Sequence, residues 1–282
     1  MVPGYLRLLV LPVGQVFDAD VPLERALTPA VAASGLLLAA VLGAGIWLAA
    51  RGRRDGSPAR VAGLGVLWFF VTISVESSLF PIDDLRFEHR VYLPSVGFAL
   101  LAAAGLALAR ERLRGAGPCA VRALGAAAAA WLLALAGAAH LRNEVWGDAV
   151  GFWEDDVAKA PGKARPRVNL GVALVQAGRP EAAVRTFESA LRLAPDDTLA
   201  RYNLAGLYAR LGFVAPAVYH YEELLRRTPG SPATRTTLAL LHLRQGRPDR
   251  AEELLRSALA ADPGYAPARQ ALEQLRRERA GR

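Results

Sequence analysis

The apolar residues of this chain change their pattern near Asn143, and that change limits what each half can fold into. A helix of roughly 20 apolar residues crosses the hydrocarbon core of a bilayer. Before Asn143, runs of about this length with almost no internal charge occur at about 31–50, 61–80, 91–109 and 120–141. Because lipid offers no hydrogen-bond partners to free backbone groups, each run is predicted to be a transmembrane helix. The second run is strongly apolar only over 61–75 and needs residues 76–80 to complete a span.

Small residues four positions apart occur within these runs, as at Ala99 and Ala103 and at Gly125 and Ala129. This spacing lets the backbones of two helices approach closely in a membrane. A chain rich in alanine also produces such pairs by chance, so the spacing alone leaves both explanations open.

The arginines of the first half lie mainly in two short loops, and these loops predict the topology. They are Arg51, Arg53, Arg54 and Arg60 in one loop, and Arg110, Arg112, Arg114 and Arg122 in the other. Short loops rich in arginine stay on the cytoplasmic side of a membrane. Residues 1–30, the loop at 80–90 and everything after Leu141 are therefore predicted to be non-cytoplasmic. We expect an integral protein of a bacterial inner membrane with a periplasmic C-terminal part; in a eukaryote the equivalent compartment is the secretory lumen.

The net charge of +8 at first favours a nucleic-acid partner. Lys159 and Lys163 are the only lysines, and the arginines are divided between loops and repeats rather than gathered on one face, so we discount this class of partner. Cys119 is the single cysteine, which excludes a disulfide within the chain. The sequence contains no cluster of metal-ligand residues at a recognised spacing, and no metal site is predicted.

A second pattern begins after the apolar runs and returns every 34 residues. Residues 164–197 carry Leu170, Gly171, Leu174, Ala183, Phe187, Ala190 and Pro195. Residues 198–231 carry, at the same offsets, Leu204, Ala205, Tyr208, Ala217, Tyr221, Leu224 and Pro229. Residues 232–265 carry Leu238, Ala239, His242, Ala251, Leu255, Ala258 and Pro263. The pattern resembles the tetratricopeptide repeat, a helical hairpin that stacks on its neighbours into a solenoid.

The segments on either side of the three repeats complete the predicted array. Residues 266–282 are expected to form a capping helix, since a stack of repeats needs a polar outer face for solubility. In residues 144–163, Ala149, Trp153 and Pro161 fall at repeat offsets, so this junction is interpreted as a half-repeat. The predicted fold is all-α, with a tail at 1–30, a four-helix transmembrane bundle at 31–143 and a tetratricopeptide-repeat α-solenoid at 164–265.

The first helix of each repeat is expected to line the concave face of the solenoid, and such faces usually bind other polypeptides. Asn169, Asn203 and Thr237 share one repeat position, and an Asn amide both donates to and accepts from a peptide backbone. Further apolar and cationic contacts are expected from Val172, Tyr202, Arg210 and Arg244. The alternative is that the asparagines only solvate an open face. We favour a groove for a protein or peptide ligand.

The first half contains one polar stretch at its predicted outer face. Its candidates for contacts to a lipid-linked phosphate or a sugar donor are Glu76, Glu88, His89, Arg90 and Tyr92. Glu76 lies close to the apolar region, where an ionised carboxylate is costly and is usually paired or functional. Cations at the outer face would suit a phosphate. The alternative is an ordinary charged loop that caps and anchors two helices, and the residues alone favour that alternative.

The run from Phe87 to Phe98, FEHRVYLPSVGF, resembles the membrane-embedded protein O-mannosyltransferase-like family of the GT-C type, whose members carry C-terminal tetratricopeptide repeats. The run from Arg142 to Asp148, RNEVWGD, resembles the junction between last span and repeats in that family. The resemblance implies a polyprenyl-phosphate sugar as donor, used on the non-cytoplasmic side. It covers only the C-terminal part of such an enzyme, and the acidic catalytic residues of the family's first outer loop have no counterpart here. No catalytic residue is therefore assigned.

Two functions are consistent with these features. The first is a polytopic membrane protein that presents a non-cytoplasmic tetratricopeptide domain for protein or peptide binding, without autonomous catalysis and without a cofactor. The second is the C-terminal portion of a protein glycosyltransferase that uses a lipid-linked sugar, either truncated or split. The sequence leaves open whether the chain is an enzyme. A small transporter is disfavoured, because apart from Glu76 the predicted spans bury no charge that could form an ion path.

Overall fold

The computed structural model describes residues 16, 28–51, 57–76 and 92–280. Within these residues all regular secondary structure is helical, which confirms the all-α class. The chain divides into two compact units, Met1–Pro161 and Gly162–Arg282, and each is described by itself.

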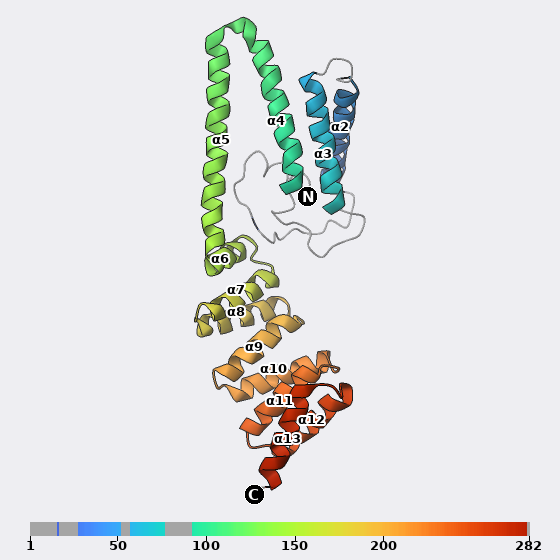
Figure 1. Cartoon of the computed structure of the whole chain (residues 1–282), viewed down its shortest axis with the longest axis vertical. Helices are drawn as coiled ribbons and strands as arrows, with labels where there is room; N and C mark the ends of the chain where they lie inside the picture. Colours follow the sequence, from blue (N-terminus) through green and yellow to red (C-terminus); the bar gives the residue numbers. More distant parts are fainter. Residues whose placement is uncertain (1–15, 17–27, 52–56, 77–91, 281–282) are drawn as a thin grey trace. The chain divides into compact units, whose positions relative to one another are not determined.

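The described residues of the first unit form long helices and a shorter one (Figure 1). They are α2 (Pro29–Arg51), α3 (Pro58–Glu76), α4 (Tyr92–Leu113), α5 (Pro118–Gly147) and α6 (Ala149–Lys159), with a 3₁₀ turn η2 (Arg114–Ala116) between α4 and α5. Among the described residues, α2, α4 with its 3₁₀ extension, and α5 are long and apolar enough to cross a membrane. The apolar part of α3, Pro58–Ser74, is shorter. The residues predicted to complete that span, 77–80, lie outside the described residues.

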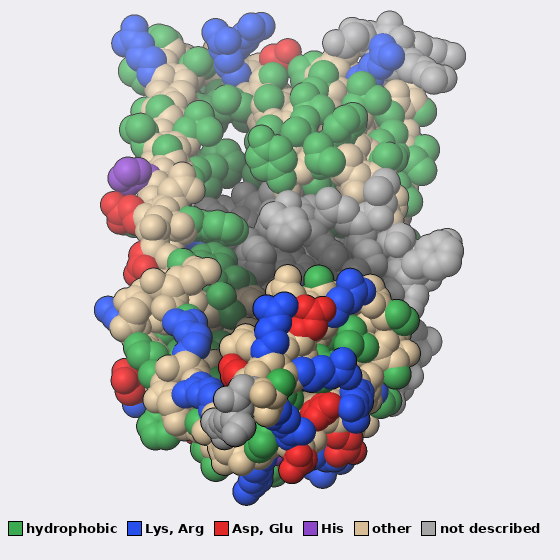
Figure 2. Space-filling view, turned by 60° about the horizontal axis from the view of Figure 1, so that its bottom comes forward, with side chains coloured by type: hydrophobic (Ala, Val, Ile, Leu, Met, Phe, Trp, Pro, Cys, Tyr) green, Lys and Arg blue, Asp and Glu red, His purple; other side chains and the backbone are tan. Residues whose placement is uncertain are grey.

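The long helices of this unit expose apolar side chains over most of their surface. Leu36 on α2 and Leu133 on α5 are both 73% exposed, and the most apolar stretch of α5 has no buried residue. Figure 2 shows these hydrophobic side chains covering the long helices, whereas acidic and basic side chains mix on the surface of the second unit. Apolar surface of this extent is rare on a soluble protein and marks contact with lipid or with another protein.

Glycines bring α2, α3 and α4 into backbone contact. A Cβ added at Gly63 would lie 2.4 Å from the backbone nitrogen of Ala49 on α2, and one added at Gly65 would lie 2.5 Å from the carbonyl oxygen of Gly97 on α4. Backbone approach of this kind is how helices associate where lipid removes the hydrophobic driving force. The predicted pair at Gly125 does not act in this way, because a Cβ at Gly125 meets no atom within 4 Å. Ala99 lines an open apolar cavity of about 750 Å³ between α4 and α5.

The arginines at the ends of α2 and α4 and at the starts of α3 and α5 lie at one end of the first unit, whereas Arg142 lies in the last part of α5. Arg51 is the last residue of α2, Arg60 lies in the first turn of α3, Arg110 and Arg112 lie in the last turn of α4, and Arg122 lies in the first turns of α5. These helix ends lie together at one end of the unit (Figure 1), and Figure 2 shows basic side chains there.

The last helix turns of α5 pair with α6. The sequence has no Pro or Gly between Gly137 and Gly147, and α5 continues to Gly147. Asp148 then caps α6, since its carboxylate accepts hydrogen bonds from the backbone N–H groups of Val150 and Gly151 at 3.1 and 3.0 Å. Arg142 of α5 donates to Asp155 of α6 at 2.8 Å. The half-repeat interpretation requires such a hairpin, and it remains a prediction.

The second unit is a row of helical hairpins. Its helices are α7 (Ala164–Gln176), α8 (Pro180–Leu193), α9 (Thr198–Arg210), α10 (Val214–Arg227), α11 (Pro232–Arg244), α12 (Pro248–Ala261) and α13 (Ala266–Ala280). Each hairpin turns at a glycine with positive φ, namely Gly178 (71°), Gly212 (85°) and Gly246 (70°). These glycines lie 34 residues apart, and only glycine adopts this conformation without strain.

The repeat residues pack as their spacing predicts. Ala183, Ala217 and Ala251 are completely buried, so the two helices of each hairpin approach closely at these positions. A Cβ added at Gly171 would lie 2.5 Å from the ring of Phe187, which is 1% exposed. The small residue after the first repeat leucine therefore makes room for the aromatic residue of the second helix.

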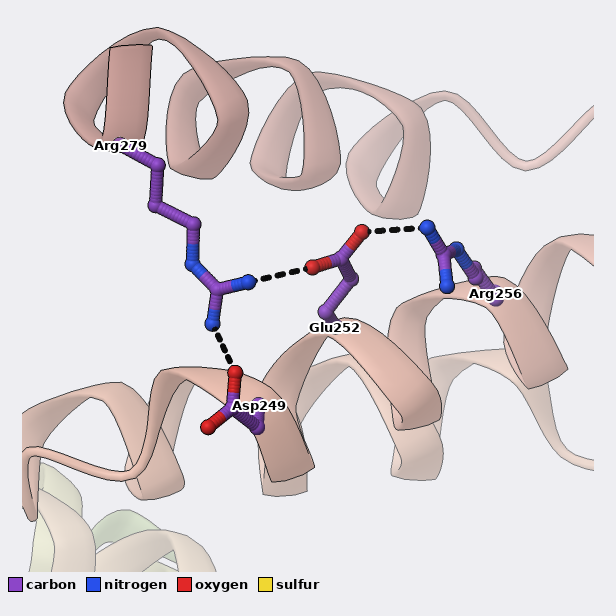
Figure 3. Close-up of polar contacts among 4 residues, drawn as sticks. All are labelled: Asp249, Glu252, Arg256 and Arg279. Carbon is purple, nitrogen blue, oxygen red and sulfur yellow. Dashed lines mark hydrogen bonds and ion pairs between the residues drawn. The ribbon is translucent and has the colours of Figure 1, made fainter. Parts of the chain in front are cut away.

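The last helix, α13, closes the array with ion pairs (Figure 3). The guanidinium group of Arg279 donates to Asp249 at 2.6 Å and to Glu252 at 2.7 Å, both on α12. Glu252 also pairs with Arg256 at 2.6 Å. The apolar face of α13 packs inward through Ala268, Leu272 and Leu275, so the helix covers the core of the third repeat and presents a polar surface.

Candidate functional site

The first helices of the repeats, α7, α9 and α11, lie in succession and form one continuous face. A hydrogen bond from Arg244 on α11 to the carbonyl oxygen of Ala209 on α9, 2.9 Å long, joins two of them. Between α7 and α9 this face contains a pocket of about 280 Å³. Its lining residues are Val172, Val175, Gln176, Phe187, Tyr202, Asn203, Gly206, Leu207, Arg210 and Tyr221.

Four of the seven residues predicted for a peptide groove line this pocket: Val172, Tyr202, Asn203 and Arg210. Tyr202 is 46% exposed and packs edge-on against Tyr221, with 5.9 Å between ring centroids. Tyr221 is 3% exposed, and burial raises the pKa of its phenol to about 12, so the floor of the pocket carries no charge at neutral pH.

The three remaining predicted residues lie on the same helices but outside this pocket. Asn169 is partly exposed one turn earlier on α7. The hydroxyl of Thr237 donates to the carbonyl oxygen of Ala233 on its own helix at 3.1 Å, so its proton is already used. Arg244 uses one of its donors on Ala209 and keeps the others free for a ligand. The predicted row of amides is thus reduced at the pocket to Asn203.

The electrostatic character of this face is uniform. The sequences of α7, α9 and α11 contain arginines and one histidine but no Asp or Glu. The acidic residues of the repeats lie on the second helices and in the turns, for example Glu188 on α8 and Glu222 on α10. Arg210 is exposed at the rim of the pocket. The face therefore favours ligands that carry negative charge.

Two features of the repeats were not predicted from the sequence. The first is Gly206 in the pocket, at the repeat position that holds Val172 and Leu240 in the neighbouring repeats. The second is a set of arginines that clamp the carbonyl oxygen of the proline ending the preceding repeat. These pairs are Arg201 to Pro195 at 2.5 Å, Arg235 to Pro229, and Arg269 to Pro263 at 2.7 Å. Their spacing of 34 residues was the available signal.

Two of the five candidates in the first unit, Glu76 and Tyr92, lie within the described residues. Glu76 is the last residue of α3. Glu88, His89 and Arg90 lie outside the described residues. Tyr92 begins α4 and is 79% exposed, and its carbonyl oxygen accepts a hydrogen bond from Ser95 at 2.6 Å. Among the described residues, no three His, Cys, Asp or Glu side chains lie close enough to hold a metal ion.

Comparison with known proteins identifies the class of the second unit. Tetratricopeptide repeat family models match residues 168–232 and 214–275. This part of the chain therefore consists of tetratricopeptide repeats, as the 34-residue pattern predicts, and forms a domain suited to protein or peptide binding.

Solved structures similar to this chain include two repeat proteins. A fragment of MamA from Desulfovibrio magneticus RS-1 has 19% sequence identity and a TM-score of 0.45, over 50% of this chain and 79% of that one. YrrB, described as a TPR protein with an unusual peptide-binding site, has 20% identity and a TM-score of 0.42, over 63% of this chain and 86% of that one. No curated protein sequence matches the chain.

Proposed function

We propose that this protein holds an extended polypeptide segment in the pocket between α7 and α9, beside a membrane that the helices of its first unit cross. The observation that carries the proposal is the pocket itself. It combines an apolar floor, the Asn203 amide and the exposed Arg210 on one face of a tetratricopeptide domain. Three repeats give a short groove, so we expect weak, reversible binding.

Membrane attachment is supported by the length and exposure of the helices. Three of them reach the length of a span, and their apolar side chains face outward. The arginines at one end of this unit favour the cytoplasmic side for that end. The C-terminal end of α5 lies at the opposite end of the same unit (Figure 1), which supports our proposal that the chain leaves the membrane on the non-cytoplasmic side.

A role in glycosyl transfer is a separate proposal and rests on the resemblance of residues 87–98 and 142–148. The matches to family models fall within residues 168–275 and do not bear on it. It predicts that the chain, in a vesicle with a polyprenyl-phosphate sugar, binds that lipid through Glu76, Glu88, His89, Arg90 or Tyr92. Binding that is unchanged by Arg90→Ala would remove its main support.

Peptide binding is tested by selecting a random peptide library on the full chain in nanodiscs and titrating the enriched peptides. Tyr202→Ala is the test variant and Tyr219→Ala is its matched control, since both tyrosines are exposed and each makes one edge-on ring contact. We expect Tyr202→Ala to weaken binding by about tenfold, and Tyr219→Ala to leave it unchanged. The proposal fails if no peptide is enriched, or if both variants bind equally well.

A further inference from the structure

The fold does not require a glycine at position 206 of the pocket. Its φ is not positive, so the backbone does not need a glycine. A Cβ built there meets only the hydroxyl oxygen of Tyr221, at 3.4 Å, which is an ordinary contact. Gly171, by contrast, is needed because a Cβ would collide with Phe187. A glycine in the middle of a helix costs about 1 kcal/mol relative to alanine, so Gly206 lowers stability without a packing reason.

The effect of Gly206 on the surface is to open the pocket. Val172 and Leu240 occupy the same position in the neighbouring repeats, and Leu240 is exposed. A side chain of that size at position 206 would project into the space between α7 and α9. Without it, the floor is formed by the buried rings of Phe187 and Tyr221. A rigid aromatic floor with apolar walls suits one bulky apolar side chain.

The guanidinium group of Arg210 lies beside the pocket at Gly206. Arg210 follows Gly206 by four residues, so the two lie on the same face of α9, one turn apart, and both line the pocket. Among the described residues, no carboxylate forms an ion pair with Arg210; the ion pairs of the repeats are made by other arginines. The equivalent residue of the first repeat is Gln176 and that of the third is Arg244. At this repeat position, the second and third repeats therefore carry a positive charge and the first repeat does not.

We propose that the pocket at Gly206 anchors a bulky apolar side chain of an extended segment, and that an acidic side chain next to this anchor pairs with Arg210. This inference rests on the proposed function and specifies its ligand. The segment is internal rather than a free C-terminus, since the face continues past Arg210 across α11 with the exposed Leu240 and with Arg244. Asn203, one turn before Gly206 on α9 and also in the pocket lining, would hold the peptide backbone through its amide.

The test uses the peptides enriched on the full chain in nanodiscs, with blocked and free C-termini, and fluorescence anisotropy as the measurement. Gly206→Leu fills the pocket, and Leu240 shows that this position accepts leucine; the control is Ala215→Leu at an exposed position of α10. Gly206→Leu is expected to weaken binding about tenfold or more, and Ala215→Leu not at all. Arg210→Gln is expected to weaken binding about two- to fivefold and to remove the preference for an acidic residue. Arg185→Gln on α8 is the control and is expected to do neither.

The outcomes separate this inference from the proposed function. If enriched peptides respond to Tyr202→Ala but lack an adjacent apolar and acidic pair, or bind Gly206→Leu normally, the groove binds peptides and the anchor assignment is wrong. If binding requires a free C-terminal carboxylate, the internal-segment assignment is wrong. If no peptide responds to Tyr202→Ala, both proposals fall.

Discussion

Replacement of Arg201 by methionine tests how the repeats are joined. The side chain of Arg201 on α9 is 7% exposed, and its guanidinium group donates to the carbonyl oxygen of Pro195 at 2.5 Å. Burial lowers the pKa of Arg201, and its Nε atom has no described acceptor. A hydrogen bond from a charged donor contributes about 2 kcal/mol to the free energy of unfolding. Methionine loses this bond but also removes the cost of burying the guanidinium charge, which offsets part of the loss. We expect a net loss of about 1–2 kcal/mol.

Arg269 provides the matched control for this prediction. It makes the same bond, to Pro263 at 2.7 Å, but its side chain is exposed, so Arg269→Met should cost well under about 1 kcal/mol. Amide hydrogen exchange of the full chain is the measurement, read over α9 for Arg201→Met and over α13 for Arg269→Met. A loss of 1–2 kcal/mol speeds exchange about five- to thirtyfold. Slower exchange in Arg201→Met would mean that desolvation of the guanidinium outweighs its hydrogen bond, and would refute this reasoning.

Three further predictions concern single residues of the repeats. Gly206→Ala should stabilise α9 by about 1 kcal/mol, seen as slower amide exchange, because a helical glycine is replaced at an uncrowded site. Burial lowers the pKa of His242, opposed by Glu222 and assisted by Arg247 and Arg250. The folded state therefore keeps this histidine neutral, and stability is fully present above the unfolded pKa of 6.5 and is lost as pH falls below it. His242→Leu should flatten the stability profile between pH 7.5 and 5, and an unchanged slope would contradict this assignment. Arg279→Gln should fray α13 by about 1 kcal/mol or less, since Asp249 is 95% exposed, and high salt should shrink the difference in exchange between variant and parent.

The repeat register was predictable because each of its residues has a local packing reason. In the structure, α7 starts at Ala164 and α13 starts at Ala266. Sequence analysis also placed Val172, Tyr202, Asn203 and Arg210 on one face, since a 34-residue period fixes which positions align. This part of the candidate site needs no long-range information beyond the period.

Other features of the candidate site depend on side-chain contacts that the sequence does not reveal. Gly206 acts through an absent side chain, and its role is apparent only against Val172 and Leu240 at the same repeat position. Arg201 looks like a surface arginine until the structure places it against Pro195. The hydroxyl of Thr237 turns back to its own helix because a threonine in a helix competes for the carbonyl one turn earlier.

In the first unit, helix existence was predictable and helix pairing was not. Apolar run length specifies α2, α4 and α5 as helices that can span a membrane. Nothing in the runs distinguishes Gly63, where an added Cβ would collide with α2, from Gly125, where an added Cβ meets no described atom of another element within 4 Å. That distinction arises only when specific helices pack together.

Cysteine accessibility in intact cells tests most directly whether the repeats bind peptides outside the cytoplasm. Cys119, exposed in the first turn of α5, lies at the predicted cytoplasmic end. Gln176→Cys, made in a Cys119→Ser background, places a thiol at the rim of the pocket. A membrane-impermeant maleimide is predicted to label the engineered thiol of this variant but not Cys119 of the parent chain. An enriched peptide is predicted to slow labelling of the engineered thiol. Labelling of Cys119 alone, or labelling at position 176 that no peptide slows, would contradict a peptide-binding face outside the cytoplasm.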